Sequence, residues 1–208
     1  MKKNRQSGFT LVEISIVLVI IGLLLGGVLK GQEIINNAKI KNAVNEFNGV
    51  TAAIYSYRDR YGALPGDDPE AAIRWPSATA GNGNGQVTHY WWYQNRTEAG
   101  WEQGHFWHHL RLSGLVSGAT EGLAATASPN HAFGGFTGVG YYQAFGWPRG
   151  PLKICMGGIT GENAEILDRQ LDDGRPLTGD FRAGVHPYNA GTDTNYDQES
   201  TYWLCKRA

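Results

Sequence analysis

One carboxylate interrupts the apolar run near the start of the chain, and its position raises the clearest chemical question in the sequence. The stretch SGFTLVEISIVLVIIGLLLGGVLK covers residues 7–30, and Glu13 is the only charged side chain between Phe9 and Leu29. A carboxylate at membrane depth is costly and marks a functional position, and it becomes tolerable when a positive group meets it. Since this run contains no Lys or Arg, the positive group must come from elsewhere.

A cut in the chain just before the run would supply that positive group. Cleavage after Gly8 leaves a new α-ammonium group on Phe9, within the same apolar environment as Glu13. The ammonium of the same chain is one candidate partner for the carboxylate, and the ammonium of a neighbouring copy is another.

The apolar run has the length of a membrane-spanning helix. Residues 9–29 would form a helix of roughly 31 Å, about one hydrocarbon thickness. Lys2, Lys3 and Arg5 precede the run, which predicts a cytoplasmic N-terminus and an exported remainder. A secretory signal peptide is one alternative, but its apolar region would be shorter and followed by a small-x-small cleavage site. A plain membrane anchor is the other, and it leaves Glu13 unexplained.

The basic leader, the sequence GFTLVE at residues 8–13 and the long aliphatic run resemble the processing signal of type IV pilins and type II secretion pseudopilins. The resemblance implies that a prepilin peptidase cuts between Gly8 and Phe9 and that Phe9 is then N-methylated. It implies that Glu13 neutralises the N-terminus of an adjacent subunit during assembly. Processed subunits would wait in the lipid of the bacterial inner membrane, from which an ATP-driven assembly platform extracts them into a pilus or pseudopilus.

The helix is predicted to continue beyond the membrane as an amphipathic segment. Its apolar stripe consists of Val44, Phe47, Val50 or Thr51, Ile54, Tyr57 and Tyr61. Its polar side consists of Asn42, Asn45, Glu46, Asn48 and Arg58. Gly62 and Pro65 are stop signals, which predicts one helix of about 50 residues from Phe9 to Arg60.

These boundaries divide the chain into a leader at 1–8, a transmembrane and assembly helix at 9–29, its amphipathic continuation at 30–61 and a head at 62–208. The fold class expected is α+β and pilin-like, in which the long helix packs on a small antiparallel sheet. Four parts of the head are β-prone or turn-rich, namely 131–145, 150–158, 201–205 and, as a loop or edge strand, 172–183. Three short helices are predicted in the head. The first follows Asp67 or Asp68 as its cap and has Pro69 in its first turn, the second covers 97–113 with Thr97 as its cap, and the third covers 161–173.

Two groups of polar residues in the head raise the question of metal binding. Asn82, Asn84 and Gln86 alternate with glycines, as in a calcium loop that lacks its carboxylates, and Glu98 and Glu102 are the acidic residues nearest in sequence. The favoured alternative is a glycine-rich turn with side-chain to backbone hydrogen bonds. His105, His108 and His109 could hold zinc only with a further ligand, whereas the apolar residues around them predict a helix that packs on the sheet with its histidines at the rim.

The two cysteines, Cys155 and Cys205, are 50 residues apart. In an exported domain such a pair is read as a disulfide, and the pilin resemblance implies the same, because many type IV pilins have a disulfide-bounded C-terminal region. The alternative is a pair of free buried thiols.

No pattern of a catalytic site is present in the sequence, which lacks GxSxG, a P-loop and a dinucleotide fingerprint. A balanced formal charge of −1 indicates no nucleic-acid partner. The sequence therefore predicts a non-enzymatic filament subunit. The alternative is a binding module at a filament tip that uses the aromatic run WWY at 91–93, although buried rings are the default for such a run.

Overall fold

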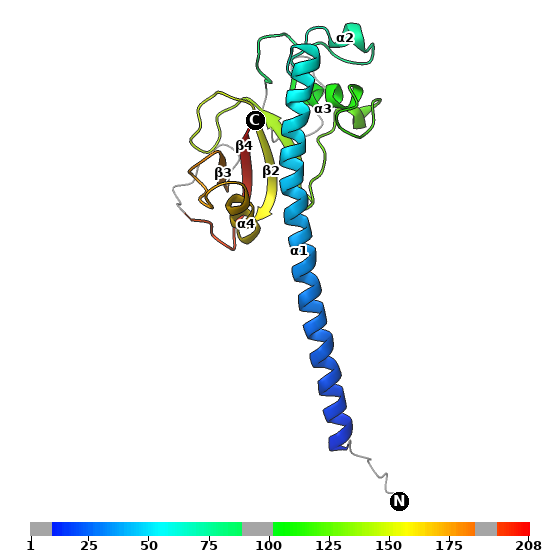
Figure 1. Cartoon of the computed structure of the whole chain (residues 1–208), viewed down its shortest axis with the longest axis vertical. Coiled ribbons are helices and arrows are strands. Elements are labelled where there is room, and N and C mark those ends of the chain that lie inside the picture. Colours follow the sequence, from blue (N-terminus) through cyan, green and yellow to red (C-terminus); the bar gives the residue numbers. More distant parts are fainter. Residues whose placement is uncertain (1–9, 89–101, 186–194) are drawn as a thin grey trace, which may run out of the picture. The chain divides into compact units, whose positions relative to one another are not determined.

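The computed structural model describes residues 10–88, 102–185 and 195–208. The chain divides into two compact units, Met1–Lys39 and Ile40–Ala208. Helix α1, Leu11–Tyr61, has residues in both units, and all other helices and strands belong to the second (Figure 1).

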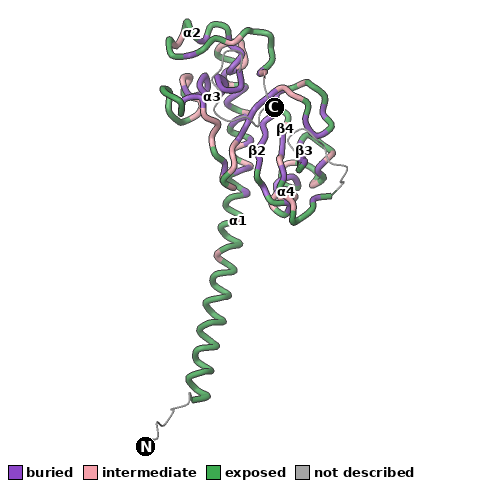
Figure 2. The backbone as a smooth tube through the Cα atoms, turned by 180° about the vertical axis from the view of Figure 1, so that it is seen from behind, coloured by how far each residue is buried: buried purple, intermediate pink, exposed green. Residues whose placement is uncertain are grey.

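The part of α1 in the first unit is exposed along almost its whole length (Figure 2). All its large apolar side chains from Leu11 to Ile35 face the outside of the unit, and none is buried by another segment. The predicted helix of about 50 residues is confirmed, with a first residue at Leu11 and a last residue at Tyr61. The helix ends where Gly62 adopts a left-handed backbone (φ +69°) and its N–H binds the Arg58 carbonyl at 2.9 Å.

In the second unit α1 buries one stripe of side chains, as its periodicity predicts. The buried residues are Ile40, Ala43, Phe47, Val50, Ala53, Ile54 and Tyr57. Glu46, expected on the polar side, is instead half-buried because its carboxylate accepts a hydrogen bond from the Thr137 hydroxyl. Burial raises the pKa of Glu46, and the Thr137 bond opposes that shift.

The head contains a four-stranded antiparallel sheet with the order β1-β2-β4-β3. The strands are β1 Thr137–Gly140, β2 Lys153–Thr160, β3 Phe181–Gly184 and β4 Thr201–Arg207. The helical elements are α2 Ala71–Arg74, α3 Glu102–Leu112, the 3-10 turn η1 Leu123–Ala125 and α4 Gly161–Leu171. The α+β prediction and the antiparallel strands are confirmed, and the edge strand β3 begins within 172–183 and ends one residue beyond it.

Successive side chains of each strand point to opposite faces of the sheet, and each face carries its own core. On one face Ile154, Met156 and Leu204 join the stripe of α1 and the buried side of α4. The rings of Phe47 and Phe181 meet edge to face there, with centroids 5.0 Å apart. The opposite face carries a smaller cluster, which consists of Ala144, Phe145, Trp147, Cys155 and Cys205.

Two predicted helix starts differ from the structure or lie outside its described part. Helix α2 begins at Ala71 with Glu70 before it and no side-chain cap, so the prediction of Asp67 or Asp68 as cap is wrong. Asp68 Oδ1 instead accepts the Glu70 N–H at 2.9 Å in the turn before the helix, while Oδ2 binds Tyr57 and Arg74. Thr97, the predicted cap of the next helix, lies outside the described residues, and α3 ends at Leu112, close to the predicted Gly114.

Truncation of the buried ring of Phe47 tests whether the α1 stripe holds the head together. We expect Phe47→Ala to lower the free energy of unfolding by about 3–5 kcal/mol, because it leaves a cavity beside Phe181. Denaturant unfolding of the full chain in detergent, followed by tryptophan fluorescence, measures the change. Tyr55 on the same helix is 54% exposed, and Tyr55→Ala is the matched control. An equal loss of unfolding free energy in the two variants would contradict the packing of Phe47 in the core.

Candidate functional site

The first turn of α1 is closed by a reciprocal pair of hydrogen bonds between Thr10 and Glu13. The Thr10 N–H and the Thr10 hydroxyl both donate to Glu13 Oε2 at 2.8 Å, and the Glu13 N–H donates to Thr10 Oγ1 at 3.2 Å. This arrangement is a capping box, in which a threonine before the helix and a glutamate three residues later satisfy each other's backbone N–H groups. It holds the Glu13 side chain against the start of the helix.

Glu13 is exposed and has no basic partner among the residues that the structure describes. The only ion pair in the exposed half of α1, among the residues that the structure describes, joins Lys30 Nζ and Glu33 Oε2 at 2.7 Å, well along the helix from Glu13. Gly8 and Phe9, predicted to be the cleavage and methylation positions, lie outside the described residues. The structure therefore shows where the carboxylate is held but not the group that would neutralise it.

Helix α1 is long and apolar enough to cross a membrane. Its most apolar window of 18 residues has a mean hydropathy of 2.7, and none of that window is buried. A soluble core helix of the same composition would bury such a surface against its own chain. The exposed half of α1 thus has the composition, length and solvent accessibility of a membrane span.

Residues 3–29 match the profile of the prokaryotic N-terminal methylation motif. The chain carries the type IV pilin and pseudopilin signal. Its motif indicates a pilin-type or pseudopilin-type subunit and implies processing by prepilin peptidase and assembly with related pilin subunits. The long apolar helix fits membrane anchoring and a pilus filament. No curated protein matches the chain.

The contact of Thr10 with Glu13 was not predicted, although the sequence contains its signal. Thr10-Leu11-Val12-Glu13 follows the pattern of Ser or Thr, two residues, then an acidic residue before an apolar run, which indicates a capping box. The processing motif concerns the charge of Glu13, whereas the capping pattern concerns its hydrogen bonds. Both readings apply to the same side chain.

The predicted disulfide is present, and it joins the central strands of the sheet. Cys155 of β2 lies directly opposite Cys205 of β4, and the Sγ atoms are bonded at 1.97 Å. Both residues are fully buried beneath Phe145 and Trp147. The disulfide therefore cross-links neighbouring strands on the sheet face opposite α1.

The loop at 82–86 has the contacts of a glycine-rich turn. Asn82 Oδ1 accepts the Asn84 N–H at 3.0 Å, and Asn84 Oδ1 accepts the Gln86 N–H at 2.9 Å. Two buried carboxylates hold the loop, since Asp67 accepts the N–H groups of residues 84 and 85 and Glu102 accepts those of 82 and 88. Glu98 lies outside the described residues. These bonds favour the turn, and calcium ligation by Asn82, Asn84 and Gln86 stays a prediction.

The histidines of α3, expected at the rim of the helix, are all buried, so that expectation is wrong. His108 Nε2 lies 3.0 Å from the Thr120 carbonyl, and both ring nitrogens of His109 bind backbone groups of 66–79. His105 is 4% exposed and has no hydrogen-bond partner in the described part of the chain. Loops on both sides of α3 cover these rings, which the periodicity of the helix alone does not reveal.

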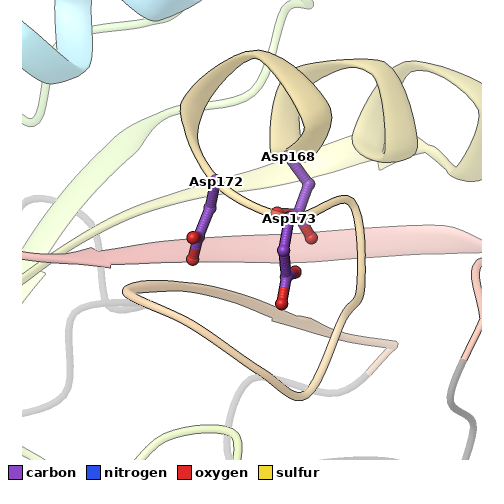
Figure 3. A group of neighbouring side chains, drawn as sticks. All are labelled: Asp168, Asp172 and Asp173. Atoms are coloured by element: carbon purple, nitrogen blue, oxygen red, sulfur yellow. The ribbon is translucent and has the colours of Figure 1, made fainter.

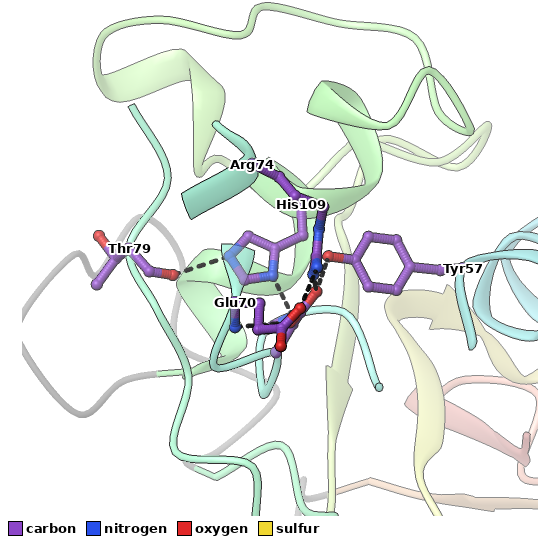
Figure 4. Close-up of polar contacts among 7 residues, drawn as sticks. Tyr57, Glu70, Arg74, Thr79 and His109 are labelled. Carbon is purple, nitrogen blue, oxygen red and sulfur yellow. Dashed lines mark hydrogen bonds and ion pairs between the residues drawn. The ribbon is translucent and has the colours of Figure 1, made fainter. Parts of the chain in front are cut away.

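A network of ionisable groups joins the C-terminal end of α1 to α2 (Figure 4). The Tyr57 hydroxyl donates to Asp68 Oδ2 at 2.7 Å, and the Arg74 guanidinium pairs with the same oxygen. Burial disfavours ionisation of Asp68, but the bonds from Tyr57 and Arg74 outweigh it and hold the pKa of this carboxyl below its usual value. Burial and the Asp68 charge together raise the pKa of Tyr57.

Asp168, Asp172 and Asp173 are the only three metal-ligating side chains that gather within 4.8 Å in the described part of the chain (Figure 3). Each carboxylate already accepts hydrogen bonds, such as that from the Tyr196 hydroxyl to Asp168 Oδ2 at 2.6 Å. Burial raises the pKa of Asp168 to about 6 against these bonds, and the charges of Asp173 and Asp172 add to the shift. No basic side chain bonds to Asp168 among the described residues.

The capping box predicts a local effect of Thr10. We expect Thr10→Val to speed hydrogen exchange of the Glu13 amide, because valine is similar in shape but offers no acceptor. Thr10→Ser is the matched control, because its hydroxyl can accept the same N–H. Amide exchange of the full chain in detergent, resolved by NMR, measures both. Equal protection of the Glu13 amide in the valine and serine variants would show that the capping box does not form.

The raised pKa of Asp168 predicts an unusual pH dependence of stability. The folded state binds this proton more tightly than the unfolded state, whose pKa is 3.8, so ionised Asp168 disfavours folding above pH about 6. We expect wild type to gain up to about 3 kcal/mol relative to Asp168→Asn as pH falls from 7 to 4. Denaturant unfolding at several pH values measures the difference, with Glu162→Gln on the exposed side of α4 as control. If the difference in unfolding free energy between wild type and Asp168→Asn did not change with pH, the raised pKa of Asp168 would be contradicted.

Proposed function

We propose that this chain is a structural subunit of a type IV pilus or a type II secretion pseudopilus, and that it polymerises through the exposed half of α1. Prepilin peptidase removes residues 1–8, and the new N-terminus at Phe9 is methylated. The observation that carries the proposal is the Glu13 carboxylate in an exposed apolar helix, inside a methylation motif and without a basic partner in the described residues.

Charge neutralisation explains why assembly would use this residue. Transfer of an isolated carboxylate out of water costs several kcal/mol, and a nearby ammonium group recovers much of it. The capping box uses Glu13 Oε2, and Oε1 takes no part in it. The α-ammonium of Phe9 from a neighbouring subunit would neutralise the carboxylate and set the register between the two helices.

The second unit supplies the exported head in this proposal. The head stands outside the inner membrane on a single-pass helix whose N-terminus is cytoplasmic, in agreement with its buried disulfide. Its partners are related subunits, membrane lipid and the assembly platform of the inner membrane. The role is structural and requires no catalytic site, cofactor or nucleic acid.

Mass spectrometry of the membrane-extracted protein, together with an assembly assay, tests the proposal. We expect wild type to lose residues 1–8 and to carry one methyl group on Phe9. Glu13→Ala should also be cut, but its yield of sheared filaments should fall at least tenfold, because the Phe9 ammonium has no carboxylate to meet.

The matched control is Glu33→Ala, which removes an exposed carboxylate of the same helix that pairs with Lys30. This variant should be processed and should assemble as wild type does. An uncut N-terminus or a cut near Gly26 would refute the processing step. Filaments of normal yield from Glu13→Ala would refute the pairing role and leave processing intact.

A further inference from the structure

His109 of α3 lies between two backbone groups of the segment that follows α1. The Gly66 N–H donates to His109 Nδ1 at 2.9 Å, and His109 Nε2 lies 2.9 Å from the Thr79 carbonyl oxygen (Figure 4). The imidazole is fully buried. The Gly81 N–H binds the Asp68 carbonyl at 2.9 Å and closes a loop that contains Thr79 and begins two residues after Gly66. We call residues 66–81 the clasped loop.

The two contacts fix the protonation state of this ring. A backbone N–H can only donate, so Nδ1 must keep its lone pair toward Gly66. A carbonyl oxygen can only accept, so Nε2 must carry the proton that points to Thr79. The folded geometry therefore requires neutral His109 in one tautomer. A second proton would sit on Nδ1 and face the Gly66 N–H donor directly.

The backbone at Gly66 cannot easily move aside while the loop stays in place. Gly66 has a left-handed conformation (φ +87°), and a Cβ at this position would overlap the Glu102 carbonyl of α3. The loop thus approaches α3 so closely that the Gly66 N–H is held against the ring. Donor–donor repulsion on protonation must then be relieved by separation of the loop from the helix.

We propose that His109 is an acid-sensitive clasp, and that its protonation releases the clasped loop, including α2, from α3. The apolar anchors of the loop are the buried Ala71 and Ala78 and the half-buried Trp75, whose ring contacts Tyr57 and Tyr61 of α1 rather than α3. Its opening would leave the sheet and the disulfide intact, since neither lies in the loop. The device is a property of the head and does not depend on the proposed assembly role.

The groups that surround His109 keep the clasp closed at neutral pH. Burial lowers the pKa of His109 to about 4, and the neighbouring His105 and His108 of α3 act in the same direction. The Thr79 carbonyl and the Asp68 carboxylate oppose the shift, and Asp68 itself is paired with Arg74. From α1, the ring of Tyr57 stacks on the imidazole with a centroid distance of 6.2 Å.

His105 reinforces the same response. Its ring is 4% exposed and neither nitrogen has a partner in the described residues, so its burial also disfavours the charged form. Burial, with a contribution from His108, lowers the pKa of His105. Opening of the region would hydrate this ring as well, and acid would favour that state.

Hydrogen exchange of the full chain in detergent, corrected for the intrinsic effect of pH, tests the clasp. An open-state pKa of 6.5 and a closed-state pKa of about 4 predict that the opening constant of residues 66–81 rises about 20-fold from pH 7 to pH 5. Peptides from β2 and β4 should show a much smaller change. A loop that opens equally at both pH values would overturn the proposal.

Two histidine variants separate the clasp from general acid sensitivity. His109→Gln keeps a donor for Thr79 and does not titrate, so the rise in the 66–81 peptides should fall well below 20-fold, and any remaining rise should come from His105. The matched control is His131→Gln, because His131 makes the same pair of backbone contacts elsewhere, with the Phe133 N–H and the Gly157 carbonyl. It should leave the pH response of residues 66–81 unchanged. An undiminished response in His109→Gln would overturn the proposal.

A measurement on wild type alone decides the case if His109→Gln fails to fold. Nitrogen-15 chemical shifts identify which ring nitrogen of His109 carries the proton. At pH 7 the clasp requires an unprotonated Nδ1 and a protonated Nε2. The opposite tautomer, or a doubly protonated ring at that pH, would overturn the proposal.

Discussion

The structure depends on the burial of one stripe of α1 within the second unit. A fully buried Leu, Ile or Phe side chain contributes about 1.5–3 kcal/mol relative to an exposed one, and this stripe brings several such residues to one surface. The sheet offers a matching apolar face, in which Ile154, Met156 and Leu204 alternate with residues that point to the other side. Without the other, each of these two apolar surfaces would be exposed to water at a cost in free energy. The head is therefore organised around residues 40–57 of the helix.

Polar contacts add to the apolar packing that holds the region between α1 and α3. Asp67 and Glu102 are buried carboxylates that bind backbone N–H groups, and His109 binds one donor and one acceptor. Such groups stabilise a loop only in a defined protonation state, because a buried donor or acceptor without a partner is costly. This region is consequently more sensitive to pH than the apolar core beneath the sheet.

Features that depend on near neighbours in the sequence could be predicted, and those that depend on distant ones could not. The bounds of α1 follow from its periodicity and from Gly62, and the antiparallel strands follow from short β-prone runs between glycines. Asp68, predicted as a cap of α2, also binds Tyr57, 11 residues earlier in the chain. The burial of His109 depends on Gly66, 43 residues away. Nothing in the local pattern of α3 shows that contact.

The N-terminal motif is local in sequence, and so is the capping contact that was not predicted. Cleavage and charge pairing need residues that are adjacent in sequence, so GFTLVE indicates both directly. The bond between Thr10 and Glu13 is equally local and could have been predicted from the capping pattern. In the head, only the disulfide was assigned correctly as a pair, because two cysteines allow a single pairing.

Three carboxylates of this chain show three ways to accommodate a negative charge away from water. Asp68 is neutralised by Arg74 and hydrogen-bonded by Tyr57, and its pKa is low. Asp168 has hydrogen bonds but no bonded cation among the described residues, and burial raises its pKa to about 6. Glu13 has only the capping contacts of Thr10, in the most apolar helix of the chain. Glu13 and Asp168 both lack a bonded cation among the described residues, and for Glu13 a processed N-terminus is the positive group that the motif would place beside it.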